Sequence, residues 1–212
     1  MTDTLTQIIA KLQILLLDDG TRFDVTTSTA AIRQALKYFN LAAPIHAGTL
    51  MDTVLGQKEY ELDVPAALEI VDVLRQGKDT YAEDHVSLNF DRYFEDGRPF
   101  FRLHSAEPTT NTLIVRYTIP HTIDELDGET DSTLSPLQDI ILLDGAAWQA
   151  CLVRAAGRVE SINLADKVTV TYRQMAVNFK ALFDIGILKM SHQTFASLPD
   201  ARRWGDKWEG QY

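Results

Sequence analysis

Residues 94–99, Phe94-Glu95-Asp96-Gly97-Arg98-Pro99, decide how the middle of this chain folds. The Asp-Gly pair tolerates the positive φ angles of a type I′ turn, whose twist matches that of two antiparallel strands. Apolar residues alternate on both sides of the turn, which is the pattern of half-buried strands: Val86, Leu88 and Phe90 before it, Phe101 and Leu103 after it. The stretch therefore predicts a β-hairpin.

Other segments around this hairpin also suit strands. Residues 60–64 alternate, and a polar turn at 109–111 precedes an alternating segment at 113–119. Residues 65–76 begin like a helix but are β-branched enough for a strand, and periodicity does not decide between the two. The acidic segment 121–134 is expected to be a solvated loop. Several short strands with turn signals predict a small antiparallel sandwich or sheet.

Two helices are predicted before this β-rich middle. Residues 4–17 place apolar side chains at i, i+3, i+4, i+7 and i+11, and Gly20 follows as a helix-end signal. Thr27 or Ser28 is the candidate N-cap of the second helix. Its expected core face consists of Ile32, Ala35, Leu36 and Phe39, and residues 40–44 are expected to end the helix.

Two more helices are predicted after it. Ser135-Pro136-Leu137-Gln138 has the form of a capping box with Pro at the first helical position. This helix is expected to reach about Ala156 and stop at Gly157, and its Ala-rich middle favours close helix–helix approach. A fourth helix is expected from about Leu164.

Composition bounds the class of protein. The chain has 212 residues, of which 45% are apolar and 24% charged, which is average for a soluble globular protein. The formal net charge of −10 argues against a protein that grips DNA by its phosphates, although a channel wall past which DNA slides is compatible with it. Acidity that only keeps the protein soluble is the simpler alternative. No apolar run has the length of a membrane helix, the N-terminus lacks the basic region of a secretory signal, and the single Cys151 makes a reducing compartment the default.

No arrangement of residues predicts a catalytic group, a metal site or a cofactor. None of the five histidines has another His or a Cys at i+3 or i+4. Cys151 is expected to be a buried small hydrophobe, and Asp18-Asp19 before Gly20 an exposed turn rather than a metal site. His121, beside the acidic segment, is left as an acid–base candidate of a small enzyme, which would require a pocket that also holds a second titratable group.

The C-terminal segment 189–212 differs from the rest of the chain because it sustains no period. It combines aromatic and basic residues, which are Phe195, Arg202, Arg203, Trp204, Lys207, Trp208 and Tyr212. Disordered tails seldom carry two Trp in five residues, and Trp and Arg are common anchors at interfaces. We therefore expect a tail that docks on a partner, with a nucleic-acid-binding module using the basic residues as an alternative.

Three stretches resemble the head–tail connector (adaptor) proteins of tailed bacteriophages. They are LDVPAALEIVDV at 62–73, IVRYTIPHT at 114–122 and SPLQDIILLDGAA at 135–147. In that family a Leu-Pro-like turn leads into an Ile/Val-rich strand, and a Tyr-x-x-Pro-His-Thr-like segment leads through an acidic loop to a long Ala-containing helix. The resemblance spans most of residues 1–185. It leaves the tail uncovered, and Val64 stands where Leu is expected before the proline.

The resemblance implies an α+β fold. Residues 1–47 and 134–188 would form a helical bundle, residues 48–133 an inserted antiparallel β-rich subdomain, and residues 189–212 an extended docking tail. It also implies a strand at 69–75.

As to function, the resemblance implies a non-enzymatic structural protein of the virion neck, assembled in the host cytoplasm. It would form a homo-oligomeric, commonly dodecameric ring between the portal protein and the next neck or tail ring. Genomic DNA would pass the lumen without specific binding, the tail would dock on the portal, and no membrane would be involved. A tail-completion or baseplate protein is the nearest alternative.

Overall fold

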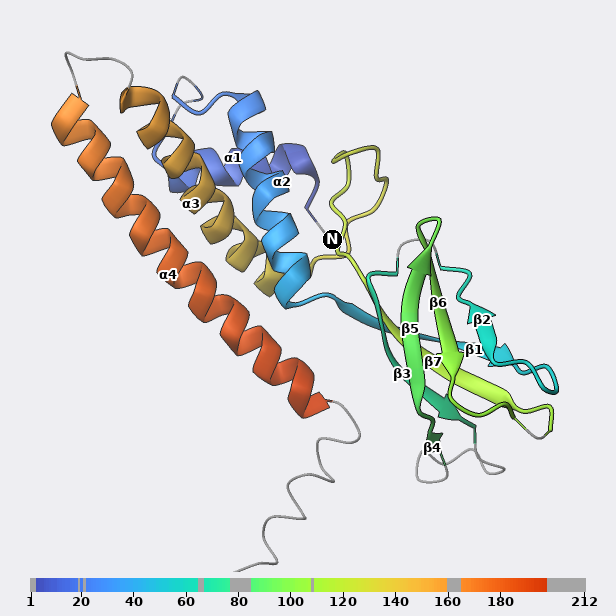
Figure 1. Ribbon diagram of the computed structural model, residues 1–212. Helices are drawn as coiled ribbons and strands as arrows, with labels where there is room; N and C mark the ends of the chain where they lie inside the picture. Colours follow the sequence, from blue (N-terminus) through green and yellow to red (C-terminus); the bar gives the residue numbers. More distant parts are fainter. Residues whose placement is uncertain are drawn as a thin grey trace, which may run out of the picture. The chain divides into compact units, whose positions relative to one another are not determined.

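The computed structural model describes residues 3–18, 20, 22–64, 67–76, 85–107, 109–159 and 165–197. The chain divides into a helical unit, Met1–Ala43 with His121–Tyr212, and a β-rich unit, Pro44–Pro120 (Figure 1). This confirms the predicted α+β class with an antiparallel part inserted into a helical one. The division differs from the expected boundaries at both junctions, because residues 44–47 group with the β-rich unit and residues 121–133 with the helical unit.

The helical unit is built around α3 (Pro136–Val159), which contacts α1 (Leu5–Leu15), α2 (Val25–Ala42) and α4 (Ala165–Ser197). The small residues in the middle of α3 are fully buried: Ala146, Ala147, Ala150 and Cys151. This confirms the predicted close helix–helix approach. Two glycines also allow this close packing. A Cβ atom at Gly145 would lie 2.8 Å from the ring of Phe183, and a Cβ atom at Gly186 would lie 2.8 Å from Cγ1 of Ile141.

The helix starts follow from side chains that satisfy the first backbone N–H groups. In the capping box of α3, the Ser135 N–H donates to Oε1 of Gln138 at 2.7 Å, as predicted. The predicted N-cap of α2 is wrong. Asp24 caps this helix by accepting from the Thr27 N–H at 2.7 Å, so Thr27 and the buried Ser28 lie within the first turn.

Two helices extend beyond their predicted ends. Helix α3 passes Gly157 and ends at Val159, and α4 continues through residues 189–197 to Ser197. The first nine residues of the predicted tail are therefore helical. A single Gly costs only about 1 kcal/mol inside a helix, and each residue added to an existing helix gains a hydrogen bond, so neither segment needs a helical apolar pattern to propagate.

The β-rich unit contains two antiparallel sheets (Figure 1). The first has the order β1 (Ile45–Asp52), β7 (Thr112–Ile119), β3 (Glu69–Arg75) and β4 (Val86–Ser87). The second has the order β2 (Glu59–Glu61), β6 (Arg98–Leu103) and β5 (Phe90–Glu95). One apolar core joins residues of both sheets, namely Tyr60, Leu62, Ala67, Ile70, Val73, Phe101, Leu103, Leu113 and Val115.

The hairpin and the ambiguous strand are both confirmed. Asp96 and Gly97 have φ of 50° and 77°, as a type I′ turn requires, and Glu95 pairs with Arg98. Strand β3 occupies Glu69–Arg75, which is the strand that the family resemblance implies.

Residues 86–90, which alternate before the hairpin turn, do not form one strand. They are divided between the two sheets. The Leu88 N–H donates to the Val73 carbonyl, whereas the Asn89 carbonyl accepts from the His104 N–H. The chain therefore changes its strand partner between Leu88 and Asn89, and β4 and β5 belong to different sheets. The predicted strand at 60–64 is also shorter, since β2 ends at Glu61.

Candidate interaction surfaces

The predicted docking tail lies almost wholly outside the described residues. Phe195 belongs to the last turns of α4, whose bounds are Ala165–Ser197. The other six predicted docking residues, Arg202, Arg203, Trp204, Lys207, Trp208 and Tyr212, follow the described part of the chain. The tail therefore remains a prediction, and α4 leads into it.

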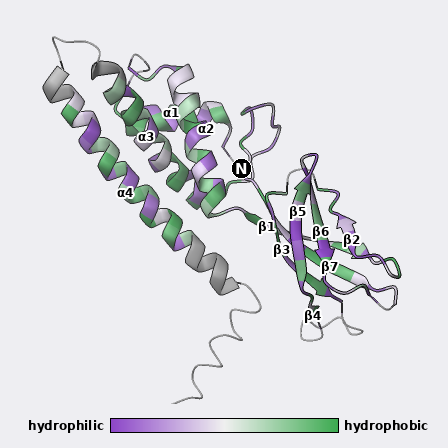
Figure 2. Ribbon diagram, viewed as in Figure 1, coloured by the Kyte–Doolittle hydropathy of each residue, from purple (hydrophilic) through white to green (hydrophobic). Residues whose placement is uncertain are grey.

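Helix α4 carries a second apolar stripe on the side away from its core contacts. Its buried side chains include Tyr172, Ala176 and Phe183. Turned by 100° per residue, the opposite side presents residues spaced by three or four positions: Val170, Gln174, Val177, Ala181 and Ile185. Val170 and Val177 are both 62% exposed and Ile185 is 51% exposed. Figure 2 shows that hydrophobic and hydrophilic residues alternate along α4.

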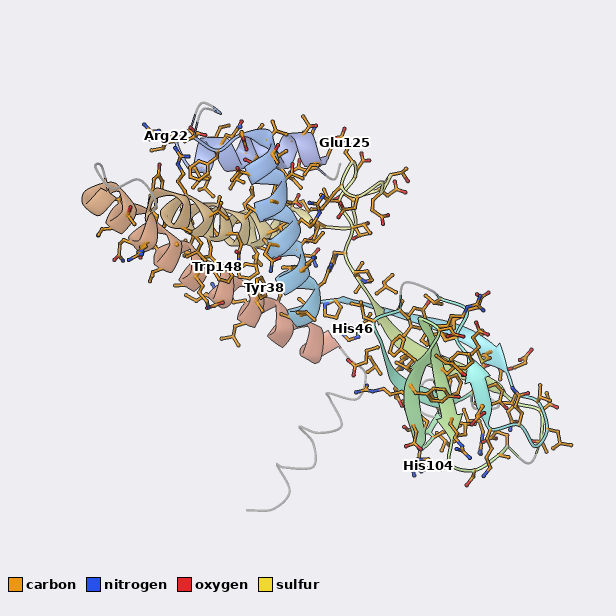
Figure 3. All side chains as sticks on the ribbon, turned by 45° about the horizontal axis from the view of Figure 1, so that its top comes forward. Arg22, Tyr38, His46, His104, Glu125 and Trp148 are labelled. Atoms are coloured by element: carbon orange, nitrogen blue, oxygen red, sulfur yellow. The ribbon has the colours of Figure 1, made fainter. Side chains whose placement is uncertain are left out.

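An aromatic cluster joins α2, α3 and α4 at the surface. The ring centroids of Tyr38 and Trp148, both labelled in Figure 3, are separated by 5.5 Å, and those of Trp148 and Phe183 by 6.1 Å. Nζ of Lys180 lies 5.3 Å from the centroid of Trp148 and pairs with Asp184 at 2.6 Å. Tyr38 is 42% exposed, so the cluster presents an aromatic edge at the surface of the helical unit. The sequence analysis missed this cluster, because its members are far apart in the chain.

The acidic segment 121–134 is held in place rather than being a free solvated loop. Ile123, Leu126 and Leu134 are buried in the helical core. The Leu5 N–H donates to the Asp124 carbonyl, and Oγ1 of Thr6 donates to Glu125 at 2.7 Å. These bonds hold an exposed row of carboxylates in a fixed position on the helical unit. Figure 3 shows Glu125 at the end of α1.

The segment also pairs with α2 and contains strained backbone. Arg33 donates two hydrogen bonds to Asp127, at 2.6 Å from Nη2 and 3.0 Å from Nε. Glu125 and Asp127 have φ of 71° and 56°, a conformation that costs a non-glycine residue energy.

Within the described part of the chain, His121 is buried among its neighbours and does not open into the pocket that the enzyme alternative requires. It is 5% exposed, with Nε2 3.2 Å from the Ala43 carbonyl and Nδ1 3.3 Å from Oγ1 of Thr133. The backbone N–H of His121 donates to Oδ1 of Asn40 at 2.7 Å, and the centroid of its ring lies 5.3 Å from that of Phe39. Burial lowers the pKa of the imidazole, and the contacts with Ala43 and Thr133 act in the opposite direction. These contacts give His121 a structural role, because they join the end of α2 to the segment that precedes α3.

Asp139, in the first turn of α3, is an uncommon buried acid. It is 5% exposed, and within the described part of the chain its Oδ1 has no hydrogen-bond partner. Burial raises the pKa of Asp139 to about 6, and the carboxylate of Asp3 acts in the same direction, while Lys11, which pairs with Asp3, acts against it. The carboxyl groups of Asp3, just before α1, and Asp139, in the first turn of α3, lie together.

Cys151 and Asp18 behave as expected from the sequence. Cys151 is fully buried, and burial raises the pKa of its thiol to about 11, so the thiolate is scarce at neutral pH. Asp18 accepts from the N–H groups of Arg22 and Phe23, as in a turn. Among the described residues, no three His, Cys, Asp or Glu side chains come together to hold a metal ion, and no helix is long and apolar enough to cross a membrane.

Comparison with known proteins gives one family. A family model described as "SU10 adaptor protein" matches residues 3–205. A similar solved structure is a chain of the "Neck of empty GTA particle computed with C6 symmetry". It is 11% identical with a TM-score of 0.28, and the match covers 65% of this chain and 87% of that chain. No curated protein matches the chain.

Proposed function

The chain belongs to the SU10 adaptor protein family, and on this premise we propose that it forms a closed ring between the portal and the tail of a phage particle. The family membership makes the chain a structural adaptor of the phage head–tail interface, in agreement with the resemblance of its sequence to head–tail connectors. The match over nearly the whole chain is the observation that carries the proposal. The proposal adds a ring of commonly twelve copies, a lumen through which genomic DNA passes, and two partners, the portal protein and the next neck or tail ring protein.

The exposed apolar surface of the helical unit supports contacts between copies. A ring closes through heterologous contacts, in which two different patches of each subunit meet around one axis. The outer stripe of α4 is one such patch, and the aromatic edge at Tyr38 and Trp148 is another.

The charge of the chain supports a lumen that DNA slides past. The net charge is −10, and the segment 121–134 holds a row of carboxylates in place at the surface. A wall of like charge repels phosphates and prevents adhesion. DNA would therefore pass without a specific site.

We assign portal docking to the C-terminal segment that follows α4. Trp204, Trp208, Tyr212 and Phe195 would be the apolar anchors, and Arg202, Arg203 and Lys207 the polar rim. Because α4 reaches Ser197, a chain that ends there retains the whole helix and loses six of these seven residues. Many weak tail contacts repeated around a ring would bind strongly by avidity.

Co-assembly with purified portal rings tests the proposal. We expect electron microscopy to show an added ring with the full chain, and portal rings without an added ring when the chain ends at Ser197. The matched control is the full chain with Trp204, Trp208 and Tyr212 kept and Asp63, an exposed residue of the β-rich unit, changed to Ala. If the truncated chain added a ring as well as the full chain, the tail assignment would be wrong. If the full chain added no ring, the adaptor ring itself would be wrong.

A further inference from the structure

Leu17 follows the C-terminal end of α1 in a backbone conformation that usually belongs to glycine. Its φ is 51°. The Leu17 N–H donates to the Ile14 carbonyl at 3.1 Å and the Asp18 N–H donates to the Gln13 carbonyl at 2.9 Å, which is the Schellman pattern of a helix end. Glycine is common at this position because a Cβ atom in the left-handed conformation lies too close to the following carbonyl oxygen. Leucine here therefore makes the folded chain less stable than glycine would.

The side chain of Leu17 does not offset this strain within its own subunit. Leu17 is 91% exposed, and Ile14, one turn earlier, is 74% exposed. Apolar side chains that stay in water contribute little to folding, since the gain is proportional to the area buried. Strained residues concentrate at functional sites. The strain and the exposure together indicate that Leu17 acts outside the subunit.

The segment that presents Leu17 is fixed in place. We call residues 14–18 the Leu17 turn. The carboxylate of Asp18 accepts from the N–H groups of Arg22 at 3.1 Å and Phe23 at 2.8 Å. Nε2 of Gln13 donates to the Phe23 carbonyl at 3.4 Å, and the ring of Phe23 is buried in the helical core. A contact made by a segment that is already ordered loses little conformational freedom on binding.

Helix α4 carries a hollow of the right form for one leucine side chain. Ala181 is exposed in its outer stripe, and the neighbouring Leu182 and Ile185 are 52% and 51% exposed. With the exposed Asn178 they have the spacing i, i+3, i+4 and i+7, which is the set of four residues that receives one knob in helix packing. We call these four residues the α4 hole. Its small member, Ala181, leaves room for a leucine.

The Leu17 turn and the α4 hole lie on different sides of one packed unit. Helices α1 and α4 both pack on α3, and Figure 3 shows α1, with Arg22 near its end, on the side of α3 opposite to α4. The two patches therefore cannot meet within one copy. The aromatic edge adjoins α4, because Lys180 lies over Trp148, so it extends the side that carries the hole. A ring needs a counterpart on the other side, which the Leu17 turn supplies.

We propose that the Leu17 turn of one copy inserts into the α4 hole of the next copy around the ring. The inference rests on the proposed adaptor ring, for which it names the contact between neighbours. Charge favours a second copy as the occupant. Asp18 and Arg22 flank the turn, and Asp184 and Lys189 flank the hole, so each acid can face a base. A partner of uniform charge would place one member of each pair against a like charge.

Replacing Leu17 with Gly separates the cost of the turn from its use. The variant relieves the left-handed strain, so we expect the purified chain to melt about 2 to 4 °C higher. It also removes the knob, so on the order of tenfold more chain should be needed to add a ring to portal rings in electron microscopy. Leu55→Ala shortens a leucine of the β-rich unit that is 68% exposed, and as the control it should change neither measurement. A Leu17→Gly chain that added rings as well as the unchanged chain would overturn the inference.

A pair of cysteines identifies the occupant. Leu17→Cys and Ala181→Cys in one chain place a thiol on each patch, while Cys151 is fully buried. Because a disulfide needs Cα atoms within about 7 Å, oxidation of rings assembled on portals should give covalent multimers larger than dimers, which neither single substitution should give. Rings that are seen by electron microscopy but give no such multimers would overturn the inference and leave the adaptor function standing. Absence of rings with the unchanged chain would instead remove the adaptor ring.

Other occupants would give different products. Covalent dimers from the chain that carries only Leu17→Cys would show a two-fold contact between turns. Protection of Ala181→Cys from an aromatic disulfide reagent in the purified chain would show that the chain's own C-terminal segment covers the hole. Either result would overturn the inference, which requires a thiol at position 181 that is reactive in the purified chain and protected in the ring.

Discussion

Replacing Asp139 with Asn tests the buried acid at the start of α3. In the folded chain its pKa is about 6, above the ordinary value of about 4. Between these two values the folded chain holds a proton that the unfolded chain has lost, so the stability from this group is complete below pH 4 and is lost as the pH rises through 6. The difference between the two pKa values corresponds to about 3 kcal/mol.

The expected gain of the variant is smaller than this limit. Asp139 lies in the first turn of α3, where the helix dipole favours a carboxylate by up to about 1 kcal/mol. Asn has the shape of the protonated acid and no charge to bury. We therefore expect Asp139→Asn to stabilise the chain by about 2 kcal/mol at pH 8 and to have almost no effect at pH 4, which corresponds to a Tm higher by about 4 to 8 °C at pH 8.

Thermal melts followed by circular dichroism at 222 nm, taken from pH 4 to pH 8, measure this difference. Asp184→Asn on exposed α4 is the matched control, because it removes only a surface ion pair with Lys180 and should change stability by less than about 1 kcal/mol. If the Tm difference between Asp139→Asn and the unchanged chain were the same from pH 4 to pH 8, ionisation of Asp139 would not destabilise the folded chain, and the reasoning would be wrong.

Four further predictions follow from the packing of the helical unit. Gly186→Ala places a Cβ 2.8 Å from Cγ1 of Ile141 and should cost about 1 to 3 kcal/mol in urea unfolding, whereas exposed Asn178→Ala should stay within about 0.5 kcal/mol. Asp24→Ala removes the N-cap of α2 and should cost about 1 kcal/mol in the same assay, and an unchanged midpoint would argue against the cap. Because the pKa of His121 is lowered in the folded chain, the unfolded chain takes up this proton first as the pH falls below about 6.5, so stability decreases toward pH 5. His121→Gln should flatten that decrease in melts at pH 5 and 7.5, and an equal slope would assign it to other groups. The thiol of Cys151 should react with an aromatic disulfide reagent only after urea unfolding, and rapid labelling of the folded chain would contradict its burial.

Local chemistry accounts for the features that the sequence predicts best. The Asp96-Gly97 turn and the Ser135–Gln138 capping box each depend on residues within four positions of one another, so their sequence suffices to predict them. The strand at 69–75 lies at the other limit. Its local propensity is ambiguous, and pairing with β7 and β4 decides its conformation, so only the family resemblance predicts it.

The features that the sequence analysis missed depend on contacts between distant residues. The change of partner between Leu88 and Asn89 is set by β3 on one side and β6 on the other. The acidic segment is held by Thr6 and Arg33, which lie about a hundred positions earlier in the chain, and its polar composition indicates only solvation. The aromatic cluster of Tyr38, Trp148 and Phe183 likewise exists only after three helices have packed.

The way in which the chain leaves the helices and returns makes residues 44–120 a detachable module. Ile45 and Ile119 face each other as the first cross-strand pair of β1 and β7. In the helical unit, the Ala43 carbonyl lies 3.2 Å from Nε2 of His121. Both ends of the excursion are thus a few ångströms apart, so a tight two-residue linker from Ala43 to His121 could replace it while the bundle keeps every buried contact of its own. Related chains could exchange this module for another of different size and still present the same helices. The contact surface of the β-rich unit could then change in evolution without a change in that of the helical unit.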